Sequence, residues 1–209
     1  MTELEIECAP DGPYLVKNLD RLRNSRGDRL PTKPITALCR CGRSSSKPFC
    51  DGTHKQTGFS DKRLTDGQNA RRMSYAGERV TIHDNRELCA HAGYCTDGLR
   101  QVFDSERSPW IDPHGASVEK ITAIVQQCPS GALSYSLDGV EQRNRTSEPS
   151  ITVTENGPYA VVGGPRLIGS GARDGTPMDR ITLCRCGASR NKPFCDGSHW
   201  NVEFKDEKN

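Results

Sequence analysis

The sequence predicts an α+β protein in which two related, strand-rich modules flank a third, mixed module. A cluster of cysteines and a histidine near residue 40 recurs 145 positions later, and the stretch between the copies has its own strand and helix pattern. Hydrophobic residues make up only 33% of the 209-residue chain, so one large apolar core is not expected. Small modules with thin cores usually need a disulfide, metal or cluster, which the ten cysteines can provide.

The repeat runs for about 50 positions without a gap. Residues 11–14 match residues 156–159, and Phe59 matches Phe204. A gapless match of this length indicates a duplicated structural unit rather than two chance motifs.

Polar stretches at 65–69 and 141–149 are interpreted as linkers between the modules. They place the first outer module at residues 1–70, the inserted module at 71–140 and the second outer module at 148–209.

Short apolar runs after turn signals indicate strands in both outer modules. Residues 14–16 and 159–162 each follow an Asp-Gly-Pro or Asn-Gly-Pro turn signal. Residues 35–38 and 180–183 lead directly into the first cysteines. Neither outer module has a long helical period.

The inserted module alternates strand and helix signals. Ser117 is suited to cap a helix, and Pro129 disfavours helical geometry at Cys128. The elements expected in order are a strand at 80–82, a short helix at 98–103, a strand at 110–111, a helix at 118–125 and a strand at 133–137.

Each outer module presents three cysteines and one histidine within 16 residues. The two sets are Cys39, Cys41, Cys50 and His54, and Cys184, Cys186, Cys195 and His199. A [2Fe-2S] cluster needs two ligands on each iron, which the Cys-x-Cys pair and the later Cys and His can supply. Structural zinc, bound by the same four donors, is the alternative on ligand types alone.

The two motifs resemble that of the CDGSH iron-sulfur family, the mitoNEET-like proteins. The family pattern is Cys-x-Cys-x2-Ser/Thr-x3-Pro-x-Cys-Asp-Gly-Ser/Ala/Thr-His, and both copies fit every position. The resemblance implies one [2Fe-2S] cluster per motif, with an exposed histidine ligand, and modules that pair as a β-sandwich. Members with one motif mostly pair as homodimers, so we expect the two modules to pair within one monomeric chain, with near two-fold symmetry.

The inserted module carries a third candidate cluster site, formed by Cys89, Cys95 and Cys128. Bacterial ferredoxins use Cys-x2-Cys-x2-Cys and a remote Cys-Pro, and here Ala92 replaces the middle cysteine. Three ligands favour a [3Fe-4S] cluster, with [4Fe-4S] as the alternative. His91 is one position out of register and is interpreted as a surface or neighbouring residue.

The order of elements in the inserted module fits a ferredoxin-like βαββαβ unit. Residues 75–137 also resemble the divergent single-cluster ferredoxin family often found beside CDGSH modules, through the cysteine spacing, Pro109-Trp110 and the segment 128–133. The tenth cysteine, Cys8, has no partner in these sets and is expected to be a free thiol, with a role as a remote ligand as the alternative.

These sites predict a soluble, cytoplasmic electron carrier with three clusters, which is not an enzyme. The net charge is +2 and no long basic run or membrane-length apolar stretch occurs, so neither nucleic acid nor a membrane is an expected partner. A redox protein or an apo-acceptor of a cluster is expected instead. Cluster storage, transfer or redox sensing is the alternative function, and a zinc-stabilised interaction module is a third.

Overall fold

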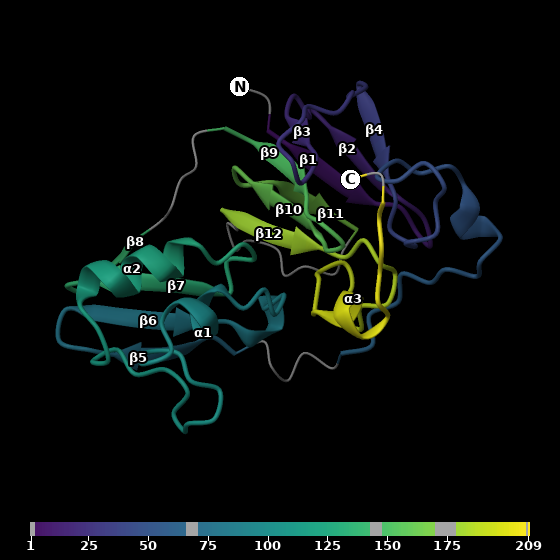
Figure 1. Ribbon diagram of the computed structural model, residues 1–209. Coiled ribbons are helices and arrows are strands. Elements are labelled where there is room, and N and C mark those ends of the chain that lie inside the picture. Colours follow the sequence, from purple (N-terminus) through teal and green to yellow (C-terminus); the bar gives the residue numbers. More distant parts are fainter. Residues whose placement is uncertain (1–2, 66–70, 143–147, 170–178, 208) are drawn as a thin grey trace. The chain divides into compact units, whose positions relative to one another are not determined.

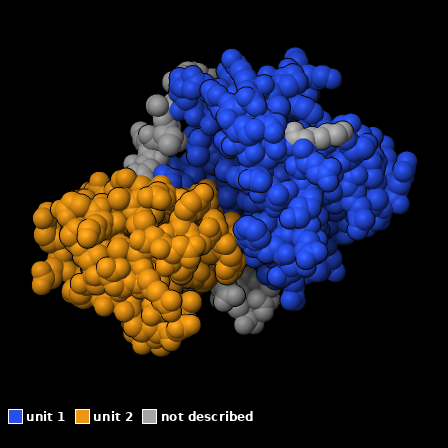
Figure 2. All heavy atoms as spheres, viewed as in Figure 1, with its two compact units in different colours: residues 1–66, 145–209 blue, residues 67–144 orange. Residues whose placement is uncertain are grey.

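The computed structural model describes residues 3–65, 71–142, 148–169, 179–207 and 209. The chain forms two compact units (Figure 2). One contains residues 1–66 and 145–209, and the other contains residues 67–144. The duplicated sequence therefore lies in one unit and the inserted sequence in the other.

The unit with the duplicated sequence contains two four-stranded sheets, ordered β11-β1-β2-β4 and β12-β10-β9-β3 (Figure 1). Their strands are β1 (Glu5–Cys8), β2 (Tyr14–Lys17), β3 (Leu22–Arg23), β4 (Ile35–Leu38), β9 (Ser150–Val153), β10 (Tyr159–Val162), β11 (Arg166–Ile168) and β12 (Arg180–Leu183). Strands of the two copies coincide at the repeat offset, which confirms that the outer modules are strand-rich.

Each sheet takes an edge strand from the opposite module. β11 pairs in parallel with β1, placing Leu167 opposite Ile6. β3 pairs in parallel with β9, placing Leu22 opposite Ile151. The remaining pairs are antiparallel and lie within one module. The exchange joins the two modules by backbone hydrogen bonds within a single chain.

The core of this unit comes from the inward-facing residues of the strands. β1 and β9 have the same alternating burial, as do β2 and β10. Tyr14 and Tyr159 are both 0% exposed, and their rings meet edge to face with centroids 6.0 Å apart. The two equivalent tyrosines thus contact each other in the interior.

The second unit has one antiparallel sheet in the order β5-β6-β7-β8, with helices α1 and α2 (Figure 1). Its elements are β5 (Met73–Ala76), β6 (Val80–Asp84), α1 (Tyr94–Gly98), α2 (Val118–Gln126), β7 (Leu133–Leu137) and β8 (Val140–Gln142). α2 packs against β7 through its buried face, which includes Ile121 and Val125. Ser117 caps this helix, as the sequence predicts, because its side chain accepts a hydrogen bond from the Lys120 amide.

The order of elements in this unit departs from the expected βαββαβ arrangement. Of the expected strand at 110–111, only Ile111 pairs, in an isolated bridge to Phe103. Pro113 follows closely and lacks the amide hydrogen that a longer ladder would use. The short helix expected at 98–103 is instead α1, four residues earlier.

Two edge strands of this sheet were missed because their residues are polar or exposed. β5 has no fully buried residue, and β8 falls partly in the segment 141–149 that the sequence suggested as a linker. The other expected linker, 65–69, lies outside the described residues except for Thr65. In the described part of the chain, no helix has the length and apolar character needed to cross a membrane.

The strand exchange predicts that a change in one outer module weakens the other. Leu22→Ala removes a fully buried side chain from β3 and should destabilise the unit by about 2–5 kcal/mol, because a cavity remains. Hydrogen exchange should rise in β9, the partner strand from the other module. Val140→Ala, at a mostly exposed position in the second unit, serves as the control. An effect confined to residues 3–65 would contradict the exchanged pairing.

Candidate metal centres

The first outer site is built where β4 ends. Cys39 and Cys41 follow the strand, and a loop returns so that the Cys39 amide donates to Pro48 O at 2.8 Å. The Cys50 amide then donates to Ala37 O at 2.9 Å. The 3-10 turn η1 (Thr53–Lys55) follows and carries His54. The two hydrogen bonds form the bridge between Leu38 and Phe49, which closes the loop and brings Cys50 back toward Cys39 and Cys41.

The second outer site repeats this construction after β12. The Cys184 amide donates to Pro193 O at 2.8 Å, and the Cys195 amide donates to Thr182 O at 3.0 Å. His199 lies on the short helix α3 (Ser198–Asn201). Each four-donor set predicted from the sequence is thus supplied by one loop and the turn after it.

The donors of each outer site form two close pairs. In the first site, the sulfurs of Cys39 and Cys41 lie 3.7 Å apart, and Cys50 Sγ lies 3.4 Å from His54 Nδ1. In the second, the corresponding distances are 3.8 Å for the sulfurs of Cys184 and Cys186 and 3.4 Å for the cysteine–histidine pair.

These spacings fit two tetrahedral metals per site. A tetrahedral ion with bonds of about 2.3 Å to sulfur and about 2.0 Å to imidazole holds two sulfurs about 3.8 Å apart, and sulfur and nitrogen about 3.5 Å apart. Each donor pair therefore suits one metal. Among the described residues, no three His, Cys, Asp or Glu side chains form a group that could hold a single metal ion.

The aspartate of each motif stabilises the turn that carries the histidine. Asp51 accepts hydrogen bonds from the amide and hydroxyl of Thr53 and from the amide and hydroxyl of Ser45. The hydrogen bonds from Thr53 and Ser45 lower the pKa of Asp51. Asp196 receives equivalent bonds from Ser198 and from the Arg190 amide. The carboxylate thus joins the ligand loop to the histidine turn.

Two buried arginines between the paired cysteines were missed from the sequence. Arg40 forms an ion pair with Asp61 and lies over the Tyr14 ring, with its guanidinium carbon 4.8 Å from the ring centroid. Arg185 is buried and pairs with Asp206. Both the arginines and the aspartates recur at the offset of 145, and this repetition could have identified them from the sequence. Each ion pair thus joins the Cys-x-Cys turn, which carries the arginine, to the segment after the motif, which carries the aspartate.

The two histidines differ in exposure. His199 is only 5% exposed and its ring lies 4.8 Å from that of Trp200, whereas His54 is half-buried and is followed by the exposed Lys55. Burial lowers the pKa of His199. The exposed histidine implied by the family resemblance is therefore wrong for the second site, where the imidazole is buried and its ring lies against that of Trp200.

The third predicted site lies within the inserted unit. Cys89, Cys95 and Cys128 line one cavity of about 340 Å³, together with Ala92 and His91. Burial raises the pKa values of the Cys89 and Cys95 thiols. The three predicted ligands thus line the same cavity, although Cys128 lies 33 positions after Cys95 in the sequence.

Arg86 contacts this third site directly, and no motif or spacing in the sequence points to it. Its Nη1 donates to Cys89 Sγ at 3.4 Å, and its Nε donates to Asp84 Oδ2 at 3.2 Å. Its guanidinium carbon lies 3.9 Å from the Trp110 ring centroid. Asp84 is buried, and this burial raises its pKa. A cation is therefore held beside one of the candidate ligands.

Cys8 is buried on β1, outside all three sites, and burial raises its pKa to about 11. It is a free thiol, as the sequence suggests. A thiol with so high a pKa is protonated at neutral pH and is therefore a weak nucleophile.

Different family models match the duplicated and the inserted parts of the chain. The family described as "Iron-binding zinc finger CDGSH type" matches residues 11–55 and 156–200, and that described as "Divergent 4Fe-4S mono-cluster" matches residues 75–138. The uncharacterized protein YjdI of Escherichia coli strain K12 is 36% identical over 75 residues, which are 36% of this chain and 95% of YjdI. The same values hold for YjdI of Escherichia coli O157:H7. No solved structure gave a significant match.

The chain therefore belongs to the CDGSH iron-sulfur family and carries a divergent mono-cluster domain between two CDGSH domains.

The unequal burial of the histidines predicts unequal loss of iron. A chelator at fixed pH should remove iron from the site of His54 faster than from that of His199, because Trp200 shields the latter. Trp200→Lys, which copies the first site, should accelerate the slow phase of the absorbance decay. Lys55→Trp is the matched reciprocal variant. A single phase that neither variant changes would refute the shielding.

Proposed function

We propose that this protein carries electrons through two [2Fe-2S] clusters at the outer sites and one further cluster at the central site. The pairing of donors at each outer site carries the proposal: each pair is 3.4–3.8 Å apart, and among the described residues no third His, Cys, Asp or Glu side chain joins a pair into a group for one metal ion, which suits two irons with two protein ligands each. Zinc remains the alternative on donor chemistry, but it needs all four donors around one ion.

The close approach of the two outer sites supports a role in electron transfer. A methyl group at Gly42 would lie 2.5 Å from Cys186 O, and one at Gly187 would lie 2.7 Å from Cys41 O. Both glycines have positive φ. The two Cys-x-Cys turns therefore meet backbone to backbone, which would place two bound clusters next to each other.

An open pocket lies at this meeting point. Its volume is about 680 Å³, and its lining residues match in pairs at the repeat offset, such as Phe59 with Phe204 and Cys41 with Cys186. The pocket gives solvent access close to a cysteine of each site, so a partner bound there would lie near both.

Bound clusters would supply one-electron chemistry, and the chain's own residues would hold and shield them. We propose that no substrate is transformed, and that the partner is a redox protein or an apo-acceptor of a cluster. We also propose a cytoplasmic monomer that binds neither nucleic acid nor membranes. A net charge of +2 and the joining of both CDGSH domains within one unit support these points.

For the central site we propose a [3Fe-4S] cluster held by Cys89, Cys95 and Cys128. Ala92 lines the cavity at the position where a ferredoxin has its remaining ligand. The alternative is a [4Fe-4S] cluster, which the description of the matching family favours.

Cluster transfer, storage or redox sensing is the second candidate function, and the half-buried His54 favours it. This imidazole and its exposed neighbour Lys55 leave one outer site more open than the other. The two functions separate in one experiment, in which the protein is mixed with an apo-ferredoxin and a redox acceptor. Electron transfer without loss of clusters supports the carrier, whereas transfer of iron and sulfide to the apo-protein supports the alternative.

Replacing an outer histidine should change the potential of its cluster. His54→Cys should retain the cluster, make it more stable to acid and lower its reduction potential, because all-cysteine [2Fe-2S] centres lie lower than centres with imidazole ligands. Acid-decay kinetics and spectroelectrochemical titration measure these changes, with wild type as reference. An unchanged potential would show that His54 is not a ligand.

Restoring a cysteine at position 92 should change the type of the central cluster. An oxidised [3Fe-4S] centre is paramagnetic, whereas oxidised [2Fe-2S] centres are silent, so the isolated oxidised protein should show a signal near g = ~2 from this centre alone. Ala92→Cys should quench the signal by forming [4Fe-4S]. A stable four-iron cluster in anaerobically prepared wild type would contradict the three-iron proposal.

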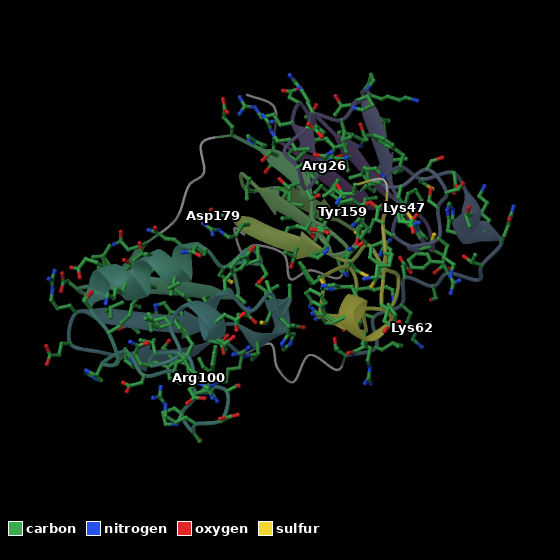
Figure 3. The ribbon with its side chains drawn as sticks, in the orientation of Figure 1. Arg26, Lys47, Lys62, Arg100, Tyr159 and Asp179 are labelled. Carbon is green, nitrogen blue, oxygen red and sulfur yellow. The ribbon has the colours of Figure 1, made fainter. Side chains whose placement is uncertain are left out.

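Removing Arg86 should lower the reduction potential of the central cluster. The guanidinium favours the more negative, reduced state through its hydrogen bond to Cys89 Sγ. Arg86→Gln should shift the midpoint by about −60 mV, a tenfold change for one electron. Arg100→Gln removes an exposed charge from the same unit (Figure 3) and is the control. Equal shifts in both variants would argue against a local effect.

A further inference from the structure

Each outer module has one tyrosine, and its side chain contacts the metal site of the opposite module. Tyr14 belongs to the first module, yet its hydroxyl shares its one hydrogen between Cys184 O and Pro193 O, both at 3.0 Å. Tyr159 belongs to the second module, and its hydroxyl hydrogen is shared between Cys39 O at 3.0 Å and Pro48 O at 2.9 Å. Figure 3 labels Tyr159 on its strand.

The accepting carbonyls lie where each ligand loop closes. Pro48 O also accepts the Cys39 amide at 2.8 Å, and Pro193 O accepts the Cys184 amide at the same distance. Each tyrosine hydroxyl therefore links the first and last residues of a ligand loop. The loop starts at a ligand cysteine (Cys39 or Cys184) and ends at a proline two residues before the third cysteine of that site. Fixing this closure fixes the spacing of the Cys-x-Cys pair relative to the later cysteine.

The tyrosines are suited to act as fixed donors. Both are fully buried, and burial raises their pKa values well above the ordinary value, so the hydroxyls stay protonated. Arg40 lies over the Tyr14 ring, and Arg185 lies over the Tyr159 ring. Each tyrosine is thus held by the arginine of its own Cys-x-Cys turn while it supports the turn of the other module.

We propose that each outer site is positioned by the tyrosine of the opposite module, so that the two sites are physically coupled. Tyr14 is the positioning residue for the site of Cys184, Cys186, Cys195 and His199, and Tyr159 is the positioning residue for the site of Cys39, Cys41, Cys50 and His54. The direct contact between the two rings joins the two supports. The inference rests on the proposed function only in that the sites hold clusters.

Tyr→Phe variants of the full chain test this crossing, because they keep the ring and remove only the hydroxyl. Hydrogen exchange by mass spectrometry should show Tyr14→Phe accelerating amide exchange in residues 184–195 about tenfold, since a lost hydrogen bond to a buried group costs on the order of 1 unit in log K. Exchange in residues 39–50 should stay near wild type. Tyr159→Phe should give the mirror result. Tyr75→Phe, in the inserted unit, is the matched control.

Cluster loss provides the second readout. In a His54→Cys background, the first site absorbs differently from the second, so the two decays separate. Tyr14→Phe should then accelerate loss from the second site about tenfold, on the same basis as the exchange. The proposal is overturned if a Tyr→Phe variant accelerates amide exchange and cluster loss mainly in its own module. It is also overturned if both sites change equally or if neither changes. A wild type without outer clusters would refute the proposed function, and the exchange measurement would still test the crossing.

Discussion

Contact between the two outer modules, which includes the parallel pairing of their edge strands, is the interaction on which both of their metal sites depend. β11 completes the sheet of the first module, and β3 completes the sheet of the second. Neither module has enough apolar residues for a sizeable core of its own, so burial is achieved across the junction. The same junction brings Gly42 against Cys186 and Gly187 against Cys41. A duplicated module thereby forms one unit with two equivalent sites, in which each sheet and each ligand loop is completed by the other copy.

The ligands were predictable because their spacing is local, whereas the contacts that hold them are not. Three cysteines and a histidine within 16 residues, repeated without a gap, define each outer set. The helix capped by Ser117 could also be predicted from the sequence, because its cap and its apolar face lie close together along the chain. The strand exchange could not be foreseen, because β3 is a two-residue strand whose partner lies over 120 residues away. The burial of His199, whose ring lies against that of Trp200, was also not expected from the motif.

The central site is built around a cavity in the inserted unit. Burial raises the pKa of its Cys89 and Cys95 thiols, as it raises that of Cys39 in the first outer site, and this disfavours bare thiolates. The Asp84–Arg86 pair places a cation beside Cys89 and partly offsets this cost. Here the sequence identified the cysteines, but not the charged pair or the element order, because the edge strands are polar and Pro113 limits the pairing of Ile111. Two kinds of cluster environment thus coexist in one chain.

The paired donors of each outer site are proposed to hold two irons bridged by sulfide rather than one zinc. Anaerobic purification followed by measurement of iron, acid-labile sulfide and zinc on the same sample tests it most directly. We expect about seven or eight irons and about eight sulfides per chain, with no stoichiometric zinc, because each outer site contributes two of each and the central cluster supplies the rest. A colourless protein with about two zinc ions per chain and no sulfide at the CDGSH sites would contradict the account.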